Sequence, residues 1–120
     1  MISVGDFRKR FDAWLFIRSR ARWGEVLSSP WIIFKTSRRL GRGETLRFEQ
    51  KVYGSGIAPD FEQLNMRNEL RKRAEACAIL YDAEIVGYEA SESLEKFWNW
   101  NDAVYMTALS ARFSLRKNIK

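Results

Sequence analysis

The feature that most constrains the fold of this chain is an alternation of apolar and polar residues near its C-terminal end. The odd positions from 105 to 115 hold Tyr, Thr, Leu, Ala, Phe and Leu, and the even positions from 106 to 116 hold Met, Ala, Ser, Arg, Ser and Arg. Successive side chains of a β-strand point to opposite faces, so this period of two is typical of a strand with one buried face. We therefore predict a long strand whose buried face carries Tyr105, Leu109, Phe113 and Leu115.

Two other segments repeat their apolar residues at steps of three and four, which is the period of an amphipathic helix. The first predicts a helix that begins near Ser3, is capped there, and ends before Gly24. Its apolar stripe is interpreted as a core face and consists of Phe7, Phe11, Trp14 and Leu15.

The second periodic segment predicts a helix from about Asp60 to about Tyr81, with Pro59 suited to its first turn. Its apolar positions are Met66, Leu70, Ala74, Cys77 and Tyr81. On this pattern Cys77 is a small buried residue rather than a reactive thiol.

Three shorter segments are typical of strands, and two further segments are interpreted as connections. The segments "WIIFKT" (31–36) and "TLRFEQKVY" (45–53) predict a hairpin joined by "SRRLGRGE" (37–44), and "AEIVGYEA" (83–90) predicts a third strand. The segment "SESLEK" (91–96) is interpreted as a polar connection or a single helical turn. The predicted fold is a single α+β domain over residues 1–120, in the order α-β-β-α-β-β, with a small, mainly antiparallel sheet packed against helices.

Composition argues against several classes of function. The chain has no histidine and one cysteine, so the commonest general base and the commonest zinc ligands are absent, and we expect no enzyme, no cofactor and no metal site. The carboxylates Asp82, Glu84 and Glu89 do not match a metal loop or a glycosidase pattern. No apolar run approaches the roughly 20 residues that cross a bilayer, and no signal pattern begins the chain, so we expect a cytoplasmic protein without membrane contact.

The densest group of basic residues is the first candidate site. It consists of Lys35, Arg38, Arg39 and Arg42. We place it at the tip of the predicted hairpin, where it is either an ordinary solvated loop or a contact for an acidic partner or a phosphate backbone. The "GRG" at 41–43 lacks the spacing of a phosphate-binding loop.

The second candidate site is the segment that contains Trp98 and Trp100. In an extended chain both indoles would point to the same side, where they could pack in the core, anchor a protein interface, or stack on nucleic-acid bases. Base stacking is the least supported of the three, because nearby carboxylates repel phosphate. The candidate interface adds the acidic residues Glu89, Glu92 and Glu95.

Charge is divided along the chain, whose net value is +6. Basic residues concentrate in the first half, and acidic residues gather between Asp82 and Glu95. Two surfaces of opposite charge can join copies of one chain head to tail, so this division favours a ring.

The order of these features resembles the small tail-terminator or neck proteins of tailed bacteriophages. The resemblance rests on an N-terminal helix, "WIIFKTSRRLGRGETLRFEQKVYG", "DFEQLNMRNELRKRAEACAILYD", and the closing "LEKFWNWNDAVYMTALSARFSLRK". It implies a non-enzymatic subunit of the virion that is assembled in the host cytoplasm. There it would form a hexameric homo-oligomeric ring that ends the tail tube and contacts neck proteins, with non-specific contact to passing DNA.

Two alternatives from other classes stay open. A small basic regulator that binds nucleic acid would explain the net charge and would lose affinity steeply with salt. A phage or plasmid inhibitor of a host protein would explain an aromatic-rich chain that lacks catalytic groups.

Overall fold

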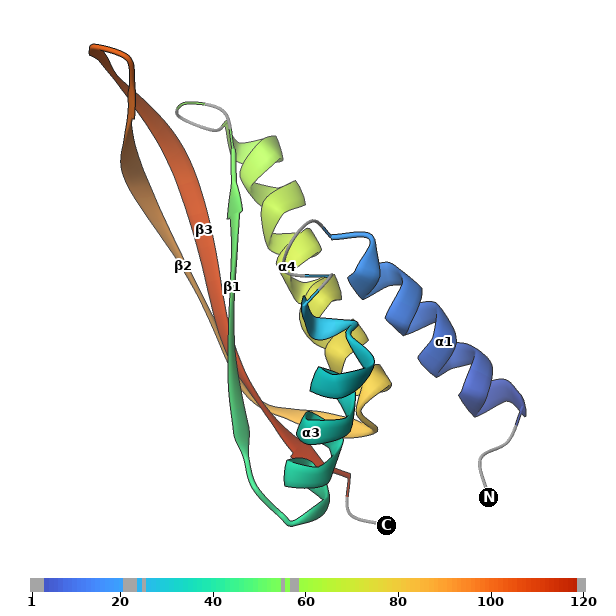
Figure 1. Cartoon of the computed structure of the whole chain (residues 1–120). Helices are drawn as coiled ribbons and strands as arrows, with labels where there is room; N and C mark the ends of the chain where they lie inside the picture. The colour runs from blue at the N-terminus through green and yellow to red at the C-terminus, as the bar shows by residue number, and fades with distance from the viewer. Residues whose placement is uncertain (1–3, 21–23, 25, 55, 57–58, 119–120) are drawn as a thin grey trace.

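The computed structural model describes residues 4–20, 24, 26–54, 56 and 59–118. Its elements follow the order α-α-β-α-β-β, so the α+β class is confirmed and the order differs from the prediction at one element (Figure 1). They are α1 (Val4–Arg18), α3 (Pro30–Gly41), β1 (Leu46–Tyr53), α4 (Asp60–Leu80), β2 (Ala83–Asn99) and β3 (Asp102–Lys117). The predicted cap at Ser3 lies outside the described residues.

The element that differs is α3, which replaces the predicted strand 31–36. Ser29 precedes it in an extended conformation and Pro30 is its first residue, an arrangement that starts helices well because a first-turn N–H needs no helical partner. Its inward positions, Ile33 and Leu40, follow the helical period. The prediction was wrong because a short apolar run has no period of its own that separates strand from helix.

The sheet is antiparallel and has the strand order β1-β3-β2. β3 is its central strand, which confirms the strand predicted from the alternation. β2 is continuous, so the interpretation of residues 91–96 as a connection or helical turn was wrong. These residues are polar because almost all of them are exposed while they pair with β3, with Glu95 half-buried.

All helices lie on one face of the sheet (Figure 1). α4 packs directly on the strands, and α1 packs on the outer side of α4. The inward side chains of β3, which include Leu109, Phe113 and Leu115, are fully buried, as predicted, and α4 contributes the predicted Met66 and Leu70. Tyr105 was predicted to be buried as well, but it is exposed because β3 runs past the end of the helical layer at this point.

The sheet face that the helices leave open is polar and charged. Arg112 lies at the centre of β3 between Glu49 of β1 and Glu89 of β2, and its Nε is 3.6 Å from Oε2 of Glu49. Lys51 Nζ donates to Glu95 Oε1 at 2.6 Å on the same face. A two-layer fold with one solvated sheet face accounts for the alternation of the strands.

The molecule is long for its size. Its extents are 56 × 25 × 24 Å and its radius of gyration is 16.3 Å, whereas a compact chain of this length has a radius of about 14 Å. The excess length comes from the β2–β3 hairpin, which projects beyond the end of β1 and α4 (Figure 1).

Candidate interaction surface

The four basic residues of the first candidate site run from Lys35 in the middle of α3 to Arg42 just beyond it, a region called here the basic end of α3, and do not lie at the tip of a hairpin. All four are exposed. Arg39 donates to Glu44 Oε1 through Nε at 3.3 Å and Nη2 at 3.2 Å, and Arg42 donates to Glu44 Oε2 at 3.4 Å. These bonds hold the pKa of Glu44 below its usual range, the hydrogen bond from Arg39 being the largest cause. Arg38 and Arg39 lie in the last turn of α3, where basic side chains are favourable without any ligand because the C-terminal end of a helix is negative.

The acidic residues proposed for the interface are distributed over both faces of β2. Glu95 binds Lys51 on the open face, and their hydrogen bond lowers the pKa of Glu95 and raises that of Lys51. Glu92 lies 3.9 Å from Arg67 of α4, and Glu89 lies opposite Arg112. Glu92 and Glu95 therefore each form an ion pair with a cation of their own chain, and Glu89 has an arginine opposite it on the neighbouring strand.

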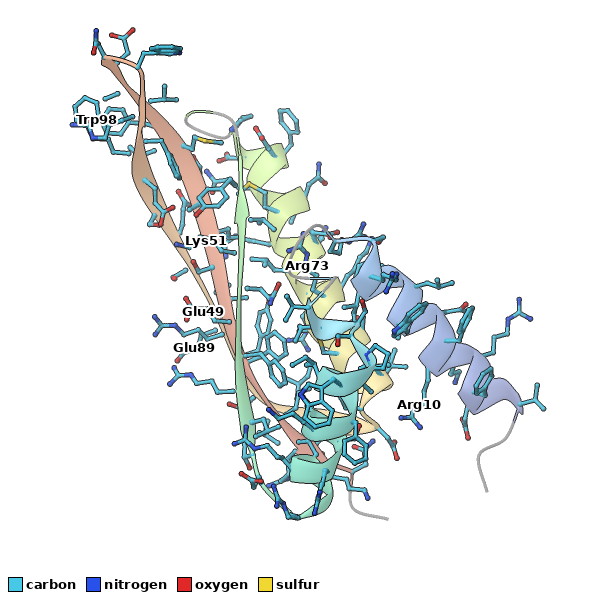
Figure 2. The ribbon with its side chains drawn as sticks, in the orientation of Figure 1. Arg10, Glu49, Lys51, Arg73, Glu89 and Trp98 are labelled. Carbon is cyan, nitrogen blue, oxygen red and sulfur yellow. The ribbon has the colours of Figure 1, made fainter. Side chains whose placement is uncertain are left out.

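The two tryptophans are exposed, so the structure does not place them in its core. They belong to a segment that we call the arm, residues 95–106, which is the part of the β2–β3 hairpin beyond the last hydrogen bonds to the β1 side of the sheet. Those last bonds run from Gly54 N to Thr107 O and from Thr107 N to Gly56 O, both at 2.8 Å. Trp98 is 70% exposed and points away from the body of the molecule (Figure 2).

The arm exposes large apolar side chains over its whole length. They are Phe97, Trp98, Trp100, Val104 and Tyr105. Neighbouring side chains cover part of two of them, since Lys96 Nζ lies 4.6 Å from the Trp98 ring centroid and Tyr53 of β1 meets the Phe97 ring edge-on at 5.5 Å. Phe97 pairs with Val104 and Trp98 with Ala103, so these side chains are spread over both faces of the arm and its tip. Several large exposed apolar side chains in one short segment are typical of a surface that binds a partner.

The tip of the arm is a two-residue turn, Trp100 and Asn101. Trp100 has φ 57° and is 95% exposed. Its left-handed backbone ends the alternation, so the prediction that Trp98 and Trp100 share one side does not hold. Glycine is the usual residue for such a position. A tryptophan there costs free energy twice, because its backbone is strained and because its indole is exposed to water.

A second apolar surface, missed in the sequence, lies on α1. Phe7 and Phe11 were predicted to be core residues but are exposed, and they stack on each other at 6.4 Å. The helix instead buries Ala13 and Ile17, which join the core with Ala76 of α4. Because Ala13 is small, α1 and α4 approach closely along this line of contact. The stripe that holds Phe7 and Phe11 therefore lies at the side of the contact and faces solvent.

This stripe borders a groove of about 320 Å³, called here the α1 groove. It is lined by Phe7, Arg10, Phe11, Trp14 and Leu80. Arg10 Nε donates to the Leu80 carbonyl oxygen at 3.1 Å, and Trp14 Nε1 donates to the Ser28 carbonyl oxygen at 2.9 Å, so hydrogen bonds orient two of its walls. Phe11 also stacks on Trp14, with ring centroids 5.9 Å apart.

Two of the carboxylates considered for catalysis or metal binding pair with side chains near the C-terminal end of β3. Asp82 Oδ1 accepts from Asn118 Nδ2 at 3.0 Å, and Glu84 pairs with Arg116. Within the described residues, no three Cys, Asp or Glu side chains gather as metal ligands do. Cys77 is fully buried, as predicted, and this burial raises the pKa of its thiol to about 12.

None of the helices in the described ranges is both long enough and apolar enough to span a membrane. No protein-family model matches the chain, and neither the curated proteins nor the solved structures that were compared with it contain a significant match.

Proposed function

We propose that this protein is a non-enzymatic assembly subunit that joins copies of itself head to tail. The observation that carries the proposal is the arm, a projecting hairpin that holds an exposed tryptophan in a left-handed turn at its tip. Aromatic anchors of this kind contribute much of the binding energy at protein interfaces. The arm is useful to the molecule only if a partner covers it.

The resemblance to tail-terminator and neck proteins of tailed bacteriophages supports the proposal that this assembly forms in a phage tail. In that setting the chain forms a ring at the end of the tail tube and joins the tube to the neck. A head-to-tail contact closes into a ring when its rotation divides a full turn, and otherwise continues as a filament. The exposed and distinct surfaces of the arm and of α1 suit such a contact.

The test is co-assembly with the tail tube encoded by the same genome. Purified protein is mixed with tubes, and the tube ends are imaged by negative-stain electron microscopy. We expect a ring that contains this chain at one end of each tube. Tubes that stay uncapped across protein concentrations would contradict the proposal.

A second candidate is binding to nucleic acid through the basic end of α3. Lys35 and Arg38 are exposed there and have no carboxylate partner among the described residues. This candidate predicts tight binding to free DNA that weakens steeply as salt rises. Uncapped tubes together with such binding would favour it over the ring.

A further inference from the structure

We infer that the arm of one copy docks into the α1 groove of the next copy, with Trp100 as the inserted side chain. The inference rests on the proposed head-to-tail assembly and names the two surfaces that meet in it. Both surfaces are apolar, aromatic and exposed in the single chain. The occupant of the groove is thus a second copy of this protein.

The positions of the two surfaces require two molecules. The arm lies at one end of the long axis of 56 Å, and the start of α1 lies toward the other end (Figure 1). One chain therefore cannot bring its own arm to its own groove. Two different surfaces at opposite ends form a heterologous contact, which repeats from copy to copy.

The charges around the two surfaces are complementary. Asp102 follows the arm tip directly and has no ion pair in the part of the chain that the structure describes. Arg10 lines the groove itself, and the exposed Arg8, which follows Phe7 in the sequence, has no carboxylate within ion-pair distance among the described residues. Opposite charges at the rim of a contact accelerate association and fix its orientation.

The geometry of the groove suits an aromatic side chain. Its volume of about 320 Å³ lies at the low end of the roughly 300–1,000 Å³ found for binding pockets. Three of its walls are the rings of Phe7, Phe11 and Trp14, which offer faces and edges for an indole. The guanidinium of Arg10 forms the fourth side, where it can meet either an aromatic face or the carboxylate of Asp102.

Complementary variants test this contact directly. Trp100→Gly removes the inserted side chain and keeps the groove, whereas Phe7→Ser/Phe11→Ser removes the groove and keeps the arm. The affected side chains are exposed, so both variants should fold. We expect each variant alone to self-associate at least about 30-fold more weakly than the natural chain, as for loss of an interface anchor.

Mixing the two variants should restore one contact. The intact arm of the groove variant fits the intact groove of the arm variant, so an equimolar mixture should give a 1:1 heterodimer that grows no further in sedimentation velocity. Trp31→Ser is the matched control, because it removes an equally large exposed indole that does not line the groove and should leave self-association unchanged. Absence of the heterodimer while the natural chain self-associates would overturn the inference.

If copies associate only on a tail tube, a photo-crosslinking amino acid at position 100 can detect the contact there. Mixed light and heavy isotopes of the chain distinguish cross-links between copies from those within one. Cross-links from position 100 to residues 4–18 of another copy support the docking. Cross-links only to another arm or to tube protein, or none in solution and on tubes, overturn it. These results are independent of ring capping, so tubes may stay uncapped while the docking itself is demonstrated.

Discussion

Replacing Trp100 with glycine should make the isolated protein more stable. The backbone of Trp100 has φ 57°, a region that costs a non-glycine residue roughly 1–2 kcal/mol. Glycine removes this cost but adds about 0.5–1 kcal/mol of conformational entropy to the unfolded chain. Since the side chain is 95% exposed, little buried area is lost with it.

The midpoints of these two ranges predict that Trp100→Gly raises the free energy of unfolding by about 0.75 kcal/mol. For a chain of this length that corresponds to a rise in Tm of roughly 2–6 °C. The measurement is urea and thermal denaturation followed by circular dichroism, under conditions in which all variants are monomeric. Self-association must be excluded because it would stabilise the natural chain by mass action.

A series of substitutions separates the turn geometry from the loss of the indole. Asparagine tolerates left-handed backbone better than alanine does, so stability should fall in the order Trp100→Gly, Trp100→Asn, Trp100→Ala. Trp98→Gly is the contrasting control, because it places glycine within a strand and removes the contact with Lys96. It should lower stability by about 1 kcal/mol.

Equal stability of Trp100→Gly and Trp100→Ala would refute the reasoning, since it would show that the tip is not left-handed. A gain in stability together with a loss of self-association would show that the tryptophan is kept for the contact at the expense of the fold.

Further predictions concern the core, the buried titratable groups and the basic end of α3. Leu109→Asp should unfold the chain because it forces a charge into a fully buried site, whereas Ser110→Asp on the open face should fold, as circular dichroism will show. The Cys77 thiol should resist alkylation in the native state at pH 8 and react on unfolding, which mass spectrometry measures. Burial raises the pKa of both Cys77 and Tyr81 to about 12. As the pH rises, the unfolded chain therefore loses these protons before the folded chain does, which favours unfolding. The urea concentration at the unfolding midpoint should decrease as the pH is raised from about 9 to about 12, and it should decrease less in the double variant Cys77→Ala/Tyr81→Phe. Replacing all four exposed basic residues with serine should leave the Tm within a few degrees and should weaken DNA binding in a filter assay only if that end contacts phosphate. These four are Lys35, Arg38, Arg39 and Arg42.

The elements that the sequence predicted well are those whose periodic pattern is long and whose burial is uniform. The alternation that includes Leu109 and Phe113 identified the central strand, and the period of Met66, Leu70 and Cys77 identified α4 with bounds that agree to within a residue. In both cases one face meets the core over most of the element's length. Over that length the burial pattern follows the sequence pattern closely enough to identify the element.

The prediction for 31–36 failed for lack of such a pattern. Within that window Ile33 is the hydrophobic residue that packs against the core cluster, and the helical spacing becomes visible only when Leu40 is included. The bonds of Arg39 and Arg42 to Glu44 could not be predicted while a hairpin was expected there.

By itself, the sequence determined the α+β class, the central strand, the long helix and the absence of histidine chemistry, because these depend on local periodicity and on composition. Only the tertiary structure decided which apolar residues stay in the core. The stripe of Phe7 and Phe11 has the spacing of a core face, but α1 packs through the smaller Ala13, and the helical layer ends before it reaches Tyr105 and Trp98. Whether an apolar side chain is covered depends on where the neighbouring elements end. The local sequence pattern does not determine those ends.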